Sequence, residues 1–142
     1  MANRLEGKVA IVTGAGRGIG RGEALALAKE GAAVIVNDLG VSTAGEGSDV
    51  SPAQEVVNEI EASGGRAIAN YMDVTNYEAS SEIVKEALDT YGQLDIVVNN
   101  AGILRDRMVF NMTEDEWDAV VAVHLKGTFN ISKHAAVLFR QQ

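Results

Sequence analysis

The chain has 142 residues, of which 46% are hydrophobic and 23% charged, with a net charge of −8 and no cysteine. Its length favours a single domain, and its acidic balance argues against a nucleic-acid or acidic-membrane surface, because those partners need clustered basic side chains. The lack of cysteine excludes disulfides and thiolate metal sites, and with no signal-like or membrane-length apolar run we expect a cytoplasmic protein.

The first predicted strand, 8–13, leads into the glycine-rich turn TGAGRGIG at 13–20. Glycine lets the backbone turn sharply and approach a ligand, and the helix N-terminus that follows attracts anions. The spacing G-x-x-x-G-x-G differs from the usual G-x-G-x-x-G fingerprint, and it is not a Walker loop. The turn therefore predicts a site for the pyrophosphate of a dinucleotide.

A helix from Ile19 to Gly31 is predicted next, followed by a strand at 33–38 that ends in Asp38. A carboxylate about 20 residues after the glycines is where a ribose hydroxyl would be held. The alternative for Asp38 is a polar residue that merely ends a strand. The following loop, 39–49, is longer than most connections; it is either a solvated insertion, which we favour, or a cover over the adenosine end of a cofactor.

Three capping boxes, at 51–54, 75–78 and 113–116, predict the starts of three further helices. Gly64-Gly65 and Gly92 would end the first two, and strands are predicted at 66–71 and 94–99. The last pattern, 117–139, is apolar nearly all round, which favours a helix with one face on the sheet and another on a partner subunit.

The alternation of apolar runs and amphipathic stretches is typical of a doubly wound α/β protein with a parallel sheet. We expect the strand order 3-2-1-4, a Rossmann fold made of N-terminal βα units only. No repeat, coiled coil or low-complexity segment interrupts the pattern.

Three motifs at strand ends resemble the signature of the short-chain dehydrogenase/reductase family: TGxxxGIG at 13–20, Asp73-Val74, and NNAG at 99–102. The resemblance covers essentially the whole chain. Segments 37–40, 99–107 and 123–127 further resemble the (3R)-hydroxyacyl-CoA dehydrogenase part of peroxisomal multifunctional enzymes and related bacterial reductases. The resemblance implies NAD-dependent hydride transfer between a nicotinamide and a secondary alcohol or ketone, with a hydroxyacyl thioester as the leading small-molecule substrate.

The resemblance also implies a set of contacts with the cofactor. They run from the pyrophosphate through the adenosine ribose and the adenine to the middle of the cofactor: Gly14, Arg17, Gly18, Ile19, Asp38, Leu39, Asp73, Val74, Asn100, Ala101 and Gly102. A carboxylate at Asp38 repels a 2′-phosphate, so NAD is favoured over NADP, although Arg17 could meet such a phosphate.

Alternatives stay open at three of the neighbouring positions. Asp73 could simply help to cap the next helix, and Asn99 is interpreted as a structural residue that bridges strand ends. His124 stands where the wider family usually has a catalytic-site asparagine. It is either a similar donor or, as we favour, a satisfied core histidine.

The family's chemistry needs a tyrosine with a lysine four residues later, and this sequence offers no such pair. Tyr71, Tyr77 and Tyr91 are followed four residues on by threonine, serine and aspartate. No catalytic residue is therefore assigned, and we interpret residues 1–142 as one dinucleotide-binding domain, truncated before the catalytic half.

Two consequences follow from this interpretation. An uncovered edge on the fourth strand favours association, and we expect a homo-oligomer through helix 117–139. The alternative function is a non-catalytic NAD-binding module completed by, or packed with, another chain. A methyltransferase-like domain fits less well, because of the NNAG motif.

Overall fold

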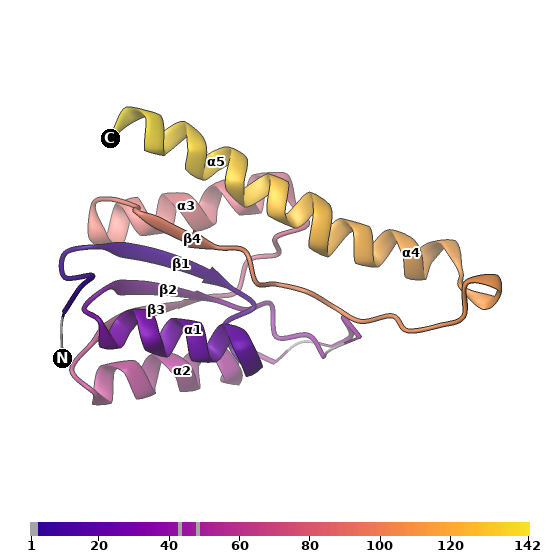
Figure 1. Ribbon diagram of the computed structural model, residues 1–142, viewed down its shortest axis with the longest axis horizontal. Helices are drawn as coiled ribbons and strands as arrows, with labels where there is room; N and C mark the ends of the chain where they lie inside the picture. Colours follow the sequence, from indigo (N-terminus) through magenta and orange to yellow (C-terminus); the bar gives the residue numbers. More distant parts are fainter. Residues whose placement is uncertain (1–2, 43, 48) are drawn as a thin grey trace.

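Strands and helices alternate along the chain in the computed structural model, which describes residues 3–42, 44–47 and 49–142 (Figure 1). The elements are β1 (Val9–Thr13), α1 (Gly18–Lys29), β2 (Ala33–Asn37), α2 (Ser51–Ala62), β3 (Arg66–Asn70), α3 (Tyr77–Tyr91), β4 (Ile96–Val98), the 3₁₀ turn η1 (Val109–Asn111), α4 (Glu114–Val121), the π-helical turn η2 (Ala122–Lys126) and α5 (Gly127–Gln141). The observed strands are shorter than predicted, most clearly at β4.

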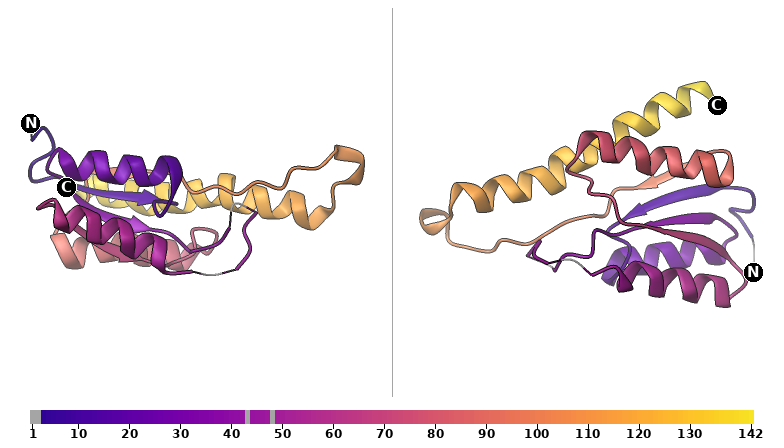
Figure 2. Two further views of the ribbon diagram at one scale, coloured as in Figure 1. Left: turned by 90° about the horizontal axis from the view of Figure 1, so that it is seen from below. Right: turned by 180° about the vertical axis from the view of Figure 1, so that it is seen from behind.

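The four strands form one parallel sheet in the order β3-β2-β1-β4, which confirms the predicted fold class. Strands β1 and β2 are buried along their whole length, as expected of apolar runs covered on both faces. Helices α1 and α2 cover one face of the sheet, and α3 and α5 cover the other (Figures 1 and 2). All four strands therefore end at one edge of the sheet, where the long loops gather.

Each face of the sheet carries its own apolar core. Under α1 and α2, small residues such as Ala24 and Ala28 let the first helix lie close to Val12. On the other face, Ile83 of α3 and Ile131 of α5 are fully buried against the strands. The close approach of α1 matters for function, because it brings the helix N-terminus to the end of β1.

The N-terminus of α2 differs from its predicted capping box. Ser51 makes no side-chain cap; instead its backbone N–H donates to Asp49 Oδ1 at 2.9 Å. The prediction was wrong because the helix begins one residue earlier than expected, with Val50 at the N-cap position and Ser51 already inside the first turn. Pro52 lies in the first turn, as predicted.

Of the other two predicted caps, one is wrong by one residue and one is confirmed. Asn76 caps α3, with its side chain accepting from Ala79 N at 2.8 Å, whereas Thr75 was predicted. Thr75 is engaged by Asp73, which accepts from both its N–H and its hydroxyl. Thr113 caps α4 by accepting from Glu116 N, and that prediction is confirmed.

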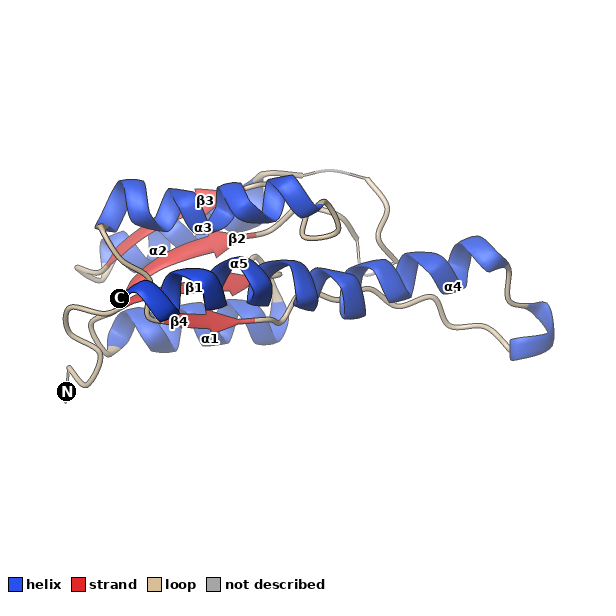
Figure 3. Ribbon diagram, turned by 90° about the horizontal axis from the view of Figure 1, so that it is seen from above, coloured by secondary structure: helices blue, strands red, loops and turns tan. Residues whose placement is uncertain are grey.

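The predicted long helix runs from α4 through η2 into α5 and contains a π-helical turn that the sequence pattern did not indicate. Ile131 and Ala135 are buried against the sheet layer, but Trp117, Leu125 and Phe129 are 63%, 70% and 57% exposed. The end of this helix that carries α4 projects beyond the sheet (Figure 3). The chain itself therefore buries only one side of this helix. The predicted contact of another side with a partner subunit stays a prediction.

None of the helices in the part of the chain that the structure describes combines the length and the hydropathy that a membrane-spanning helix requires.

Candidate cofactor-binding site

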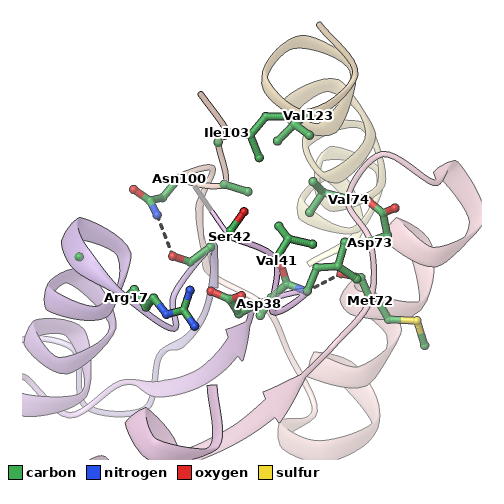
Figure 4. Close-up of a pocket in the computed structure, with 16 residues that line it drawn as sticks. Arg17, Asp38, Val41, Ser42, Met72, Asp73, Val74, Asn100, Ile103 and Val123 are labelled. Atoms are coloured by element: carbon green, nitrogen blue, oxygen red, sulfur yellow. Dashed lines mark hydrogen bonds between the residues drawn. The ribbon is translucent and has the colours of Figure 1, made fainter. Parts of the chain in front are cut away.

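A cavity of about 280 Å³ opens at the carboxyl edge of the sheet (Figure 4). It lies at the point where the strand order reverses, since β2 and β3 are on one side of β1 and β4 is on the other. Ligands bind at such topological switch points in open α/β sheets. Its lining is Gly14, Arg17, Gly18, Asn37, Asp38, Leu39, Val41, Ser42, Met72, Asp73, Val74, Asn100, Ala101, Gly102, Ile103 and Val123.

The predicted cofactor contacts gather around this one cavity, with one exception. Ile19 does not line it, and its side chain is 76% exposed. The helical direction of α1 explains this, because the residue after Gly18 already turns outward. The assignment of these residues to a cofactor stays a prediction; what the structure establishes is that they share a cavity.

The glycine turn is joined to the end of β4 by Asn100 and Thr13. Asn100 Nδ2 donates to the carbonyl oxygens of Thr13 and Gly14, each at 3.1 Å. Thr13 Oγ1 accepts from the N–H groups of Asn100 and Ala101 at 3.1 and 3.0 Å. Both amide hydrogens of Asn100 are thereby used, so its side chain holds the wall of the cavity in place.

This finding corrects the bridging role that we assigned to Asn99. Asn99 is exposed and its Nδ2 donates to Ser132 Oγ at 3.1 Å, on helix α5. The strand alternation puts Asn99 and Asn100 on opposite sides, and it is Asn100 that faces the turn.

The first turn of α1 presents its backbone N–H groups at the cavity without a side-chain cap. Arg17 occupies the N-cap position and makes no capping hydrogen bond, and the first turn contains no acidic residue. Gly18 begins the helix with a φ of 56°, a conformation that favours glycine. Unfilled donors together with the helix dipole make this end of α1 suited to an anion.

Asp38 is held at the end of β2 by two backbone groups. Its Oδ2 accepts from Gly16 N at 2.8 Å, and its Oδ1 accepts from Gly40 N at 2.7 Å. A Cβ on Gly16 would lie 2.7 Å from Oδ2, so only glycine allows this approach. Because a carboxylate oxygen accepts more than one hydrogen bond, Asp38 can still receive hydroxyl donors from the cavity.

The segment after β3 forms the opposite wall. Asp73 Oδ1 accepts from Thr75 N and Thr75 Oγ1, each at 2.8 Å, and so shapes the turn before α3 rather than capping that helix. The carbonyl oxygen of Val74 accepts from Asn130 Nδ2 at 2.8 Å and from Ser80 Oγ at 3.1 Å. These bonds fix Val74 to helices α5 and α3.

Asn37, Asn70 and Met72 form a link that sequence reasoning missed. Buried Asn37 donates through Nδ2 to Asn70 Oδ1 at 2.8 Å and to the carbonyl oxygen of Met72 at 3.0 Å. Asn37 and Asn70 are direct partners in the β2–β3 register, and two asparagines ending neighbouring strands were the available signal. The link holds the Met72 segment beside Asp38.

The start of the loop after β2 lines the cavity, whereas Glu46, Gly47 and Asp49 further along are exposed, so the solvated insertion that we favoured describes only part of the loop. Val41 and Ser42 line the cavity, and Arg105 from the segment after β4 donates through Nε to the carbonyl oxygen of Ala44. Loops from both sides of β1 thus meet at the cavity. Residues 43 and 48 of the predicted loop lie outside the described residues.

His124 sits within the π-helical turn η2 and is exposed, so it is not the core histidine that we favoured. Its Nε2 lies 3.1 Å from Ile103 N and 2.9 Å from Ile103 O. A Cβ on Gly102 would lie 2.6 Å from the His124 ring. The histidine therefore packs on the loop that lines the cavity and positions Ile103.

The doubly wound sheet and the cavity at its reversal point define a Rossmann-like α/β protein. Residues 8–142 match the model of the family described as short chain dehydrogenase, and the chain belongs to this family. The family resemblance of the sequence motifs is thereby confirmed. Members of the family use NAD or NADP.

Similar proteins include several with named activities. The chain is 52% identical to the peroxisomal multifunctional enzyme type 2 of Mus musculus over 93% of its own length and 18% of that protein. It is 49% identical to the hydroxyacyl-CoA dehydrogenase ChsB1 of Mycobacterium tuberculosis over 97% of its length and 42% of that protein.

Among solved structures, a short chain dehydrogenase from Mycobacterium avium matches with a TM-score of 0.89 and 50% identity. That match covers 97% of this chain and 48% of the other. The chain therefore spans less than half the length of each of these three relatives.

Proposed function

We propose that the cavity binds NAD(H), and that the chain provides the nucleotide-binding part of a dehydrogenase that moves hydride between the nicotinamide and a secondary alcohol or ketone. The observation that carries the proposal is the placement of Asp38. Its carboxylate is fixed by two backbone N–H groups and lines the same cavity as the uncapped start of α1. One end suits sugar hydroxyls and the other suits a pyrophosphate.

The same carboxylate supports NAD over NADP. A 2′-phosphate on the adenosine ribose would bring negative charge against Asp38, and such like-charge contacts cost several kcal/mol in a specific site. In this proposal Asp73, Val74 and Met72 border the adenine, and Asn100, Ala101 and Gly102 lie under the middle of the cofactor; the proposal is supported by their lining one cavity.

For the substrate we propose a hydroxyacyl thioester, in line with the name of the similar hydroxyacyl-CoA dehydrogenase ChsB1. Oxidation would carry a hydride from the alcohol carbon to the nicotinamide and a proton from the hydroxyl to a base. The resemblance assigns that base to a tyrosine backed by a lysine, a pair that none of the three tyrosines of this chain forms, so no residue here is given that role.

The competing proposal is an NAD-binding module without chemistry of its own. Incubating the 142-residue chain with NAD⁺ and a β-hydroxyacyl-CoA, and following NADH formation, separates the two. Turnover by the chain alone would eliminate the module.

Two further expectations belong to this proposal. Self-association through the helix formed by α4, η2 and α5 is supported by its exposed apolar side chains. The cytoplasmic location stays a prediction, because the named relatives include both peroxisomal and bacterial proteins.

The direct test is a fluorescence titration of the chain with NADH, with Asp38→Ala as the variant. Removing the carboxylate should weaken NADH binding by about 1–3 kcal/mol, because the ribose hydroxyls lose a charged acceptor. Asp106→Ala is the matched control, since Asp106 is exposed and does not line the cavity. Unchanged affinity in Asp38→Ala removes Asp38 from the site, and no binding by the unmodified chain refutes the function.

A further inference from the structure

Arg17 is the one basic side chain that lines the cavity, among the residues that the structure describes. It stands at the glycine turn directly before α1, and 57% of its side chain is exposed (Figure 4). A guanidinium at this place is the group that a 2′-phosphate would need, because arginine binds phosphate through paired, charge-assisted hydrogen bonds. The proposed preference for NAD therefore depends on what else engages Arg17.

The group that engages it is Asp49, a residue with no role in the function proposed above. Asp49 Oδ2 lies 3.9 Å from Arg17 Nη2. Asp49 itself does not line the cavity, and it belongs to the connection between β2 and α2. The Asp49 carboxylate thus contacts the Arg17 guanidinium from outside the cavity lining.

Asp49 is held in place by two hydrogen bonds to nearby residues. Its backbone N–H donates to the carbonyl oxygen of Gly40 at 2.7 Å, closing the neck of the loop. Gly40 has a φ of 83°, and a Cβ there would lie 1.9 Å from the carbonyl oxygen of Asp49. Oδ1 of Asp49 accepts from Ser51 N at 2.9 Å. The carboxylate is therefore anchored, with Oδ2 left for Arg17.

The charge state of Asp49 is fixed by the same contacts. Hydrogen bonding from Ser51, with a smaller contribution from the charge of Arg17, lowers the pKa of the Asp49 carboxyl. Asp49 is therefore ionised throughout the neutral range.

The loop also connects the two carboxylates. Gly40 donates its N–H to Asp38 and accepts from Asp49 N through its carbonyl, so one residue sets the position of both acids. Asp38 faces the proposed ribose site, whereas Asp49 faces the guanidinium beside it.

We propose that Asp49 is a specificity-determining residue: it engages Arg17 and adds a second negative charge, and both effects disfavour a 2′-phosphorylated nucleotide. This inference rests on the proposed NAD site. Asp38 repels the phosphate directly, and Asp49 withdraws the cation that would otherwise compensate. The selectivity for NAD is thus divided between a strand end and a loop neck.

The test compares the dissociation constants of NADH and NADPH for the unmodified chain and for Asp49→Asn. Asparagine keeps the oxygen that accepts from Ser51 N and loses only the charge. We expect NADPH to bind about 3- to 10-fold more tightly, because an exposed ion pair is weak and the removed charge is partly screened. NADH affinity should change less than about 2-fold, since Asp38 is untouched.

Glu46→Gln is the matched control, because it removes one negative charge from the same loop at an exposed position outside the cavity lining. We expect it to leave the NADH-to-NADPH ratio unchanged. In a second comparison, adding Arg17→Ala to Asp49→Asn should abolish the gain in NADPH affinity. Raising the ionic strength should shrink the difference between the unmodified chain and Asp49→Asn.

The outcomes separate this inference from the function on which it rests. If the unmodified chain binds NADH and Asp49→Asn leaves the ratio unchanged, or shifts both affinities equally, the inference is overturned and the NAD site stands. An equal shift from Glu46→Gln overturns it as well, since a general charge effect would then suffice. If the unmodified chain binds neither nucleotide, both the function and the inference fall.

Discussion

Gly20 occupies the point where α1 comes closest to the joint between β1 and β4. A Cβ at Gly20 would lie 2.3 Å from Asn100 Nδ2 and 2.3 Å from the carbonyl oxygen of Gly14. Those two atoms are hydrogen-bonded to each other, so a methyl group at Gly20 must force them apart or push the helix away. The third glycine of the motif therefore serves packing rather than direct ligand contact.

We predict that Gly20→Ala destabilises the chain by about 1–3 kcal/mol, the usual cost of overpacking, and weakens NADH binding as the turn shifts. Gly22→Ala is the control in the same helix, because nothing lies within 4 Å of a Cβ there. That substitution should stabilise the chain by about 0.5–1 kcal/mol through helix propensity. Urea unfolding measures both; similar effects at the two glycines would contradict the packing argument.

At this scale, the sequence indicated the residues whose types carry the chemistry. Glycines before a helix and a carboxylate at a strand end form a pattern along the chain, so Gly14, Gly18 and Asp38 were found. Asn37 and Met72 were missed because their contact crosses from one strand to the next. Such a contact depends on register, which no local pattern contains.

Helix α3 illustrates how neighbouring polar residues compete for one role. The stretch before it offers Thr75 and Asn76 as caps, and Asn76 is selected because Asp73 has already engaged both polar groups of Thr75. A sequence motif shows which side chains can cap a helix, but not which of them are already hydrogen-bonded to another residue.

We predict that Asn76→Ala destabilises the chain by about 1 kcal/mol, since the N–H of Ala79 loses its acceptor. Ser81→Ala is the control within the same helix. Its hydroxyl is bonded only to the carbonyl oxygen of Glu78, and its loss should stay within about 0.5 kcal/mol. Thermal unfolding followed by circular dichroism distinguishes the two, and a Ser81→Ala effect as large as that of Asn76→Ala would argue against the assigned cap.

On the scale of the molecule, the sheet order and the two helical layers followed from the alternation of periodicities. The same periodicity overestimated how much of the last helix is covered by the chain itself. Trp117 of α4, Leu125 of η2 and Phe129 of α5 remain exposed, and we refer to these three side chains as the apolar stripe of the helix.

We predict that this stripe drives self-association and that Leu125→Glu weakens it, because a charge would have to be desolvated in the contact. Sedimentation velocity over a range of concentrations should show a smaller average species for Leu125→Glu than for the unmodified chain. Ala26→Glu adds the same charge at an exposed position on α1, across the sheet, and should sediment like the unmodified chain. A monomer at every concentration would remove the partner face from the proposal.

The π-helical turn η2 also fixes the angular phase between the two ends of the last helix. Each residue of an α-helix advances the chain by about 100°, so the wider turn at 122–126 offsets α4 against α5 by a fraction of a full rotation. An uninterrupted α-helix through the same residues would instead turn Trp117 to another side of the axis while Ile131 stayed in the core. The direction in which the Trp117 side chain points is thus set several residues away, by the changed hydrogen-bond pattern of the π-helical turn.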